Sequence, residues 1–121
     1  MTRQILDQSH VHLAIRDRIA DQHADLLREV RDAIERNPVV VIGMKTNPFP
    51  RKARQLLDAK KLPYAYLEYG SYLSQWRRRN ALKMWSGWPT LPMIFVKGTL
   101  IGGADDLAKL IDSGELDRLL A

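Results

Sequence analysis

Residues 88–98 read WPTLPMIFVKG, and this stretch carries the clearest strand and turn signals in the chain. The apolar run 93–96 predicts a buried strand, and the Lys-Gly pair after it predicts the tight turn of a hairpin. Residues 99–101 are then the partner strand. Two glycines follow at once and precede a helical pattern over residues 104–112, with Gly114 separating a last short helix. The C-terminal third is therefore predicted to be a hairpin followed by helices.

Toward the N-terminus the chain alternates between strand and helix patterns. Residues 39–42 form an uninterrupted β-branched run of the kind that buried parallel strands use, and residues 64–69 alternate as a further strand. We expect helices over residues 21–36, 48–60 and 73–84. Residues 11–15 fit a strand or a first helical turn equally well. In order, these elements predict a mixed sheet with helices on both faces.

The charge of the chain is concentrated in its middle. The 121 residues carry 19 Lys and Arg against 14 Asp and Glu, which is a net charge of +5 at pH 7. Residues 45–97 contain eleven of these bases and only two acids, whereas residues 1–37 and 98–121 are weakly acidic. The middle of the chain would therefore attract an anion, whether a small molecule, a nucleic acid or an acidic protein.

The sequence contains no cysteine. This excludes disulfides, thiolate catalysis and cysteine-ligated zinc or iron–sulfur sites by this chain alone. His10 and His12 have no third ligand nearby, so we expect no metal site. No apolar run approaches the ~20 residues that a membrane span needs, and the N-terminus lacks a signal-peptide core. We therefore expect a cytoplasmic protein of one domain, without a membrane partner.

Three separated segments resemble, in order and spacing, the glutaredoxins, a branch of the thioredoxin-like fold. They are MKTNPFPRKA (44–53), WPTLPMIFVKG (88–98) and IGGADDL (101–107). The Trp-Pro-Thr-x-Pro stretch before a strand is most similar to the monothiol branch. The resemblance spans about residues 22–120 and implies an α/β fold with a mixed four-stranded sheet flanked by helices. It divides the chain into an added N-terminal segment (1–20), which we expect to be helical, and a glutaredoxin-like domain (21–121).

The resemblance also implies a site for glutathione, a tripeptide with two carboxylates and one amine. Lys45 and Arg79 match cations that pair with the glycine carboxylate in the family. Pro92 matches the family's cis-proline, which would turn the backbone N–H and C=O of Leu91 toward the ligand. A glycine turn matches the helix N-terminus that binds the γ-glutamyl carboxylate. Its members are Gly102, Gly103, Ala104 and Asp105, of which Asp105 would hold the γ-glutamyl amine.

The loop that carries the family's chemistry is altered. The family has Cys-Pro-Tyr-Cys or Cys-Gly-Phe-Ser just before the basic start of a helix. Counted back from residues 51–53, Asn47 stands where the nucleophilic cysteine belongs and Pro50 where the second cysteine or serine belongs. Counted forward from Lys45, the loop is one residue shorter, and Asn47 lies beside that place. Phe49 either closes over a ligand or covers the start of the helix.

Thiol–disulfide exchange requires a thiolate, and no side chain present replaces it. We therefore expect a non-redox protein that keeps a pocket for glutathione or a similar anionic, γ-glutamyl-type ligand, without a required cofactor and without an iron–sulfur cluster. One alternative is a basic module that docks an acidic protein through the 45–97 surface; nucleic acid is less favoured, because only charge supports it. A second is an oxidoreductase that uses a partner's thiol. The N-terminal segment leaves a homodimer open.

Overall fold

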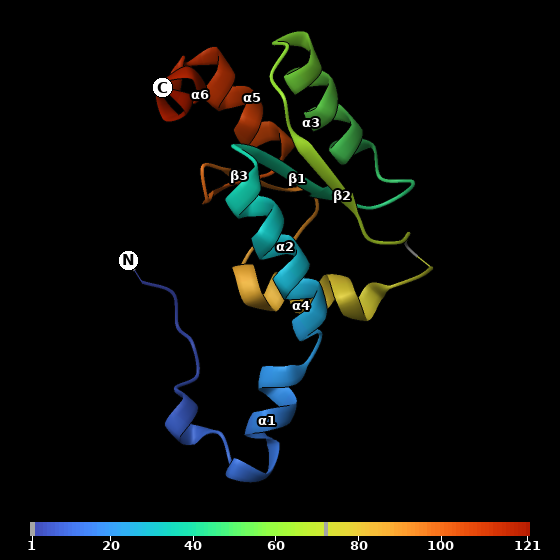
Figure 1. Ribbon diagram of the computed structural model, residues 1–121, viewed down its shortest axis with the longest axis vertical. Helices are drawn as coiled ribbons and strands as arrows, with labels where there is room; N and C mark the ends of the chain where they lie inside the picture. The colour runs from blue at the N-terminus through green and yellow to red at the C-terminus, as the bar shows by residue number, and fades with distance from the viewer. Residues whose placement is uncertain (1, 72) are drawn as a thin grey trace.

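One sheet of four strands organises the computed structural model, which describes residues 2–71 and 73–121 (Figure 1). Met1 and Tyr72 lie outside the described residues. The strand order is β2-β1-β3-β4, with β1 and β2 parallel and the other neighbouring pairs antiparallel. The strands are β1 (Val39–Gly43), β2 (Ala65–Glu68), β3 (Met93–Val96) and β4 (Thr99–Gly102). The predicted mixed four-stranded sheet is confirmed.

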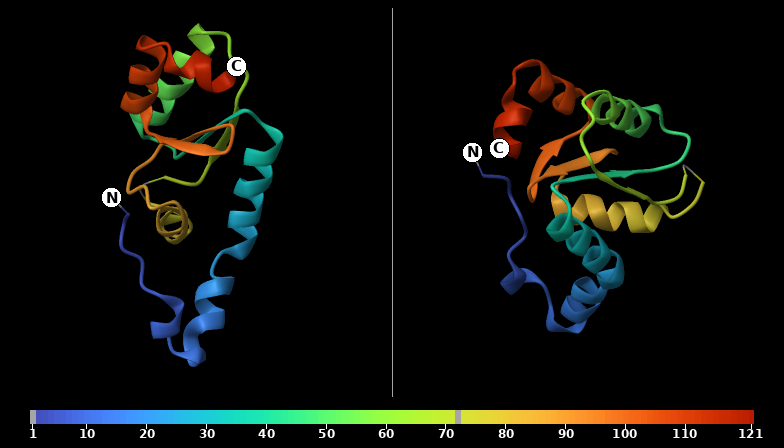
Figure 2. Two further views of the ribbon diagram at one scale, coloured as in Figure 1. Left: turned by 90° about the vertical axis from the view of Figure 1, so that its left-hand side faces the viewer. Right: turned by 45° about the horizontal axis from the view of Figure 1, so that its top comes forward.

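Helices cover both faces of this sheet (Figures 1 and 2). They are α2 (Ala24–Arg36), α3 (Pro48–Ala59), α4 (Trp76–Ser86), α5 (Ala104–Asp112) and α6 (Glu115–Leu120). Helices α3, α5 and α6 pack on one face, and α2 and α4 on the other. The helix predicted over residues 73–84 begins later, at Trp76, because a turn precedes it in which the hydroxyl of Ser74 accepts a hydrogen bond from the N–H of Ser71.

The N-terminal segment is helical and extends away from the sheet (Figure 2). It contains a 3-10 turn, η1 (Gln8–His10), and helix α1 (Leu13–Asp21). The ambiguous residues 11–15 therefore enter a helix and not a strand. His12 stabilises this start, because its Nδ1 accepts a hydrogen bond from the N–H of Ala14 at 3.0 Å.

The helix predicted over residues 21–36 is wrong at its beginning. Asp21 is the last residue of α1, and the next helix begins only at Ala24. His23 separates the two, because its φ of 53° lies in the left-handed region and interrupts the helical path. The apolar spacing continues through this break, so the sequence pattern alone does not show it.

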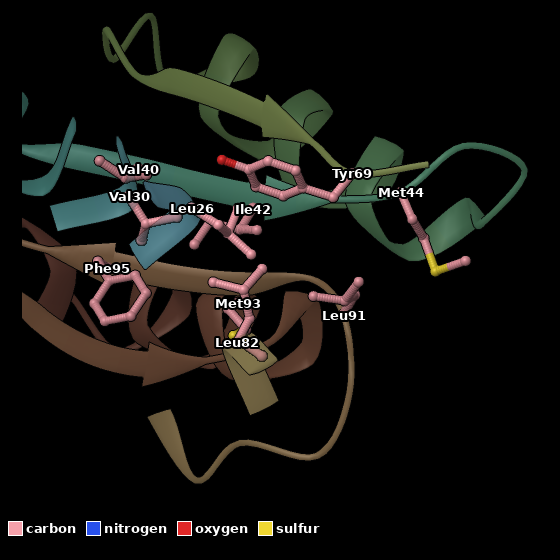
Figure 3. Close-up of a cluster of buried hydrophobic side chains, with 10 residues drawn as sticks. All are labelled: Leu26, Val30, Val40, Ile42, Met44, Tyr69, Leu82, Leu91, Met93 and Phe95. Carbon is pink, nitrogen blue, oxygen red and sulfur yellow. The ribbon is translucent and has the colours of Figure 1, made fainter. Parts of the chain in front are cut away.

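The side chains of β1 alternate between two buried clusters, as a strand covered on both faces requires. Val40 and Ile42 pack toward α2 and α4, whereas Val39 and Val41 pack toward α3 and α5. The first cluster is drawn in Figure 3 and consists of Leu26, Val30, Val40, Ile42, Met44, Tyr69, Leu82, Leu91, Met93 and Phe95. Met44 and Leu91 lie at one end of this cluster, just beyond the end of β1 (Figure 3).

Residues 2–71 and 73–121 contain neither a candidate membrane-spanning helix nor a candidate metal cluster. None of the helices there is both long and apolar enough to cross a membrane. No group of three or more His, Cys, Asp or Glu side chains in this part of the chain is placed to hold a metal ion.

Gly43 ends β1 at a point where the backbone has no room for a side chain. A Cβ atom there would lie 2.7 Å from the Cβ of Pro50 and 2.8 Å from the hydroxyl of Tyr66. Because the proline ring is buried and bound to the backbone of α3, it cannot rotate away. We expect Gly43→Ala to lower the free energy of unfolding by about 1–3 kcal/mol, the usual cost of overpacking, in urea denaturation.

The matched control is Gly103→Ala, also at the end of a strand and before a helix. Its new methyl group would find its nearest neighbour at 3.6 Å, an ordinary contact. We expect Gly103→Ala to lower the free energy of unfolding by less than about 1 kcal/mol, mainly because alanine is a poorer helix cap than glycine. Equal losses in the two variants would contradict the steric explanation.

Candidate functional site

A cavity of about 480 Å³ lies where the start of α3, the loop before β3 and the start of α5 meet. These are the three segments that carry the sequence motifs. The residues that line the cavity are Met44, Asn47, Phe49, Lys83, Trp88, Pro89, Thr90, Leu91, Pro92, Gly103, Ala104, Asp105 and Asp106. Six of the predicted ligand residues thus come together: Phe49, Leu91, Pro92, Gly103, Ala104 and Asp105. The peptide bond between Leu91 and Pro92 is cis, as the resemblance implies.

Asn47 connects two walls of the cavity. Its Oδ1 accepts a hydrogen bond from the N–H of Phe49 at 2.9 Å, which makes it the N-cap of α3. Its Nδ2 donates to the carbonyl of Leu91 at 3.4 Å. That carbonyl is the group expected to face a ligand, and it has a second lone pair. A ligand N–H would therefore share this acceptor with the amide of Asn47.

The first turn of α3 offers no free N–H group from its first three residues. Pro48 and Pro50 have no amide hydrogen, and the N–H of Phe49 is already bonded to Asn47. A helix N-terminus normally attracts an anion through such unpaired N–H groups. The start of α3 therefore offers neither a thiol nor the full set of N–H groups that would stabilise a negative charge there.

Met44 and Lys45 point to opposite sides of the loop after β1. Met44 is 6% exposed, packs in the first cluster and lines the cavity. Lys45 is exposed and lines a separate hollow on the other side of the loop. The reason is that the alternation of β1 continues past Gly43, so Ile42 and Met44 share a face. The structure does not bring Lys45 to the cavity wall.

Arg79 also lies away from the cavity. It is 6% exposed, and its Nη1 donates to the carbonyl of Tyr69 at 3.0 Å and to the carbonyl of Ser74. Its guanidinium group holds the connection between β2 and α4. Lys83, one helical turn later, lines the cavity instead. The sequence analysis missed Lys83, although its spacing of four residues from Arg79 places both side chains on one helix face.

The two acidic residues at the start of α5 have different partners. Asp106 caps the helix, because its Oδ2 accepts a hydrogen bond from the N–H of Gly103 at 2.9 Å. Asp105 forms an ion pair with Lys52 at 3.0 Å, in which the two side chains are 72% and 50% exposed. Such an exposed ion pair contributes little to stability. A ligand amine that binds Asp105 would therefore displace only a weakly bound Lys52 side chain.

Trp88 adds a polar group to the cavity wall. The residue is half-buried, packs against the first cluster and lines the cavity. Its indole N–H is buried and has no acceptor in the part of the chain that the structure describes. A buried donor without a partner is uncommon. No sequence signal distinguishes such a tryptophan from one with a bonded N–H.

Taken together, the cavity wall offers a carboxylate at Asp105, an ammonium at Lys83, backbone groups and apolar surface. This set suits a small ligand that carries both charges. It contains no thiol, and thiol–disulfide exchange cannot begin without one.

Comparison with known proteins supports one family. The Glutaredoxin family model matches residues 39–101. A "Glutaredoxin-like protein" of Dictyostelium discoideum is 46% identical over 98 residues, which is 81% of this chain and 80% of that protein. "Monothiol glutaredoxin-5, mitochondrial" of Schizosaccharomyces pombe is 33% identical over 96 residues, or 75% of this chain and 66% of that protein. The crystal structure of wheat glutaredoxin superposes with a TM-score of 0.69 at 28% identity, covering 81% of this chain and 91% of that one.

Proposed function

Because this chain belongs to the glutaredoxin family and has no cysteine, we propose that it is a non-redox member that binds glutathione or a related γ-glutamyl ligand in the cavity. The observation that carries the proposal is the meeting of three distant motif segments around one cavity of about 480 Å³. The volume is of the size that small-molecule sites have. The family's ligand thus retains a place to bind, while the group that would react with it is absent.

The proposed pose follows from the polar groups of the wall. The γ-glutamyl carboxylate would lie at the start of α5, where helix N–H groups favour an anion. Its amine would bind Asp105 in place of Lys52. The glycine carboxylate, at the other end of the tripeptide, would use Lys83 in place of the two cations implied by the resemblance. The central residue would run past Leu91, whose carbonyl accepts a single long bond within the described part of the chain, from Asn47.

An iron–sulfur cluster does not fit the donor set of this chain. Such clusters are held mainly by cysteine thiolates, and the side chain at position 47 is an amide that caps α3 and reaches Leu91. Our proposal therefore includes no cluster-binding role.

We expect glutathione to bind saturably, with a Kd in the range of about 0.1–1 mM, in an NMR or calorimetric titration. Asp105→Ala should weaken this binding about tenfold, because it removes one charge-assisted hydrogen bond. The matched control is Asp112→Ala, on the same helix but exposed at its far end, which should bind as the wild type does. S-methylglutathione should also bind like glutathione, since no bond to sulfur forms. Absence of saturation at about 10 mM would overturn the proposal.

The alternative of a basic docking module is less favoured by the placement of the cations. Lys52 and Lys60 form ion pairs with Asp105 and Asp117, Arg78 with Asp25. Arg79 is buried. Four of the eleven bases in residues 45–97 are thus paired or buried, which lowers the positive charge that this surface offers to a partner.

A further inference from the structure

We propose that a second site, which binds a phosphate group, lies on the opposite side of the 44–47 loop from the cavity. A hollow of about 300 Å³ is found there, bounded by the loop, the first turns of α3 and the end of β2. Met44 and Asn47 form the wall between the two spaces. The hollow is lined by three cationic side chains, Lys45, Arg51 and Arg54. None of the three lines the cavity.

Arg54 is held in place and lacks an acceptor for its Nε. Its guanidinium carbon lies 4.1 Å from the ring centroid of Tyr66, in a cation–π contact. Its Nε is buried and has no hydrogen-bond partner among the described residues. Removing a charged group from water without giving it a partner is costly. An oxyanion in the hollow would offset this cost by placing negative charge next to the guanidinium.

The charge of the hollow is positive and largely uncompensated. Within residues 2–71 and 73–121, Lys45, Arg51 and Arg54 form no ion pair within 4.0 Å. One carboxylate, that of Glu68, lines the hollow. It accepts a hydrogen bond from the hydroxyl of Tyr66 at 3.1 Å. Burial, together with this bond, raises the pKa of Tyr66 to about 12, so the phenol stays neutral and donates to Glu68 at physiological pH.

The surplus charge selects the class of anion. Three cations against one carboxylate leave two positive charges, which a phosphate dianion balances and a single carboxylate does not. Arginine matches tetrahedral phosphate with two parallel N–H bonds, and Arg51 and Arg54 follow each other on the same side of α3. A free phosphate ion and a phosphate monoester share this chemistry. The site is therefore assigned to the phosphate group itself.

The test is a titration with inorganic phosphate at low ionic strength, followed through the amide resonances of the hollow. We expect saturable shifts there, and a loss of affinity of about fivefold to tenfold in Arg54→Gln. Arg31→Gln, an exposed arginine on α2, makes the same change of charge far from the hollow and should bind phosphate as the wild type does. Lys45→Gln repeats the test with an exposed side chain whose loss leaves the Tyr66 stacking intact.

The relative affinities of different anions give a second test of the proposed phosphate site. Sulfate should bind about as well as phosphate, and acetate at least about fivefold more weakly, because it brings only one charge. O-phosphoserine should shift the same resonances if the site accepts a phosphate monoester. If the site takes only the free ion, inorganic phosphate should shift them and O-phosphoserine should not. Either outcome places the phosphate group in the hollow. Equal weakening in Arg31→Gln, equal binding of acetate, or shifts that do not saturate would overturn the proposal.

Discussion

A glutathione-coupled disulfide-reduction assay is expected to show no turnover by this protein above the uncatalysed rate. The reaction begins with attack of a thiolate on sulfur, and the chain has no cysteine to supply one. Asn47 cannot replace it, because an amide is not a nucleophile toward a disulfide and its Oδ1 already bonds the N–H of Phe49. Turnover by the purified wild-type protein would contradict the non-redox proposal.

Introducing a cysteine at position 47 alone is expected to give little disulfide-reduction activity. In Asn47→Cys the thiolate would receive the N–H of Phe49, but residue 50 is a proline and has no N–H to donate. We expect the thiol pKa to stay near the ordinary value of about 8.5 in this variant. The double variant Asn47→Cys/Pro50→Ser should lower it by about one unit, since one hydrogen bond to a charged group contributes about 1.5 kcal/mol.

This comparison can be measured cleanly because the introduced cysteine is the only one in the chain. The pH dependence of alkylation by iodoacetamide reports its pKa directly, and the disulfide-reduction assay should show more turnover in the double variant than in the single one. Pro50→Ser alone, which adds the N–H without a thiol, is the control and should remain inactive. Equal thiol pKa values in the two cysteine variants would show that the N–H of residue 50 does not lower the pKa of the thiol.

Arg79→Met is expected to lower the free energy of unfolding by about 2–4 kcal/mol in urea denaturation. The guanidinium group donates to the carbonyls of Tyr69 and Ser74, and the substitution would leave these acceptors without partners in a buried place. The resemblance to glutaredoxins implies instead that Arg79 binds the glycine carboxylate of the ligand. Stability and ligand binding, measured on the same variant, separate the two roles.

Lys83→Met is the matched control, on the same helix and with the same change of charge. Lys83 is half-buried and lines the cavity, and its ammonium group makes no hydrogen bond or ion pair with the described residues. We expect its stability to change by less than about 1 kcal/mol, while its affinity for glutathione falls about fivefold to tenfold. If Arg79→Met were as stable as the wild type and lost glutathione binding, Arg79 would be a ligand residue after all.

In the 44–47 loop, the sequence alone did not predict the direction of each side chain. The count back from the basic start of α3 placed Asn47 at the lost cysteine, and the count forward from Lys45 placed it beside that position. The structure instead decides which way Lys45 points. Met44, and not Lys45, continues the inward face of β1 after Ile42, so the lysine belongs to the other side of the loop.

The sequence by itself determined the fold, the absence of a thiol and most of the cavity wall. These depend on residue type and on motifs within short segments, such as the Trp-Pro-Thr-x-Pro stretch, the glycine turn and the strand-like run 39–42. Only the tertiary structure decided the direction of the cations. Whether Lys45, Arg79 or Lys83 reaches the cavity depends on which side of the loop faces the packed core, on how far along α4 the residue lies, and on which carbonyl groups need a donor there. Those requirements arise between segments that are far apart in the chain, so no local pattern contains them.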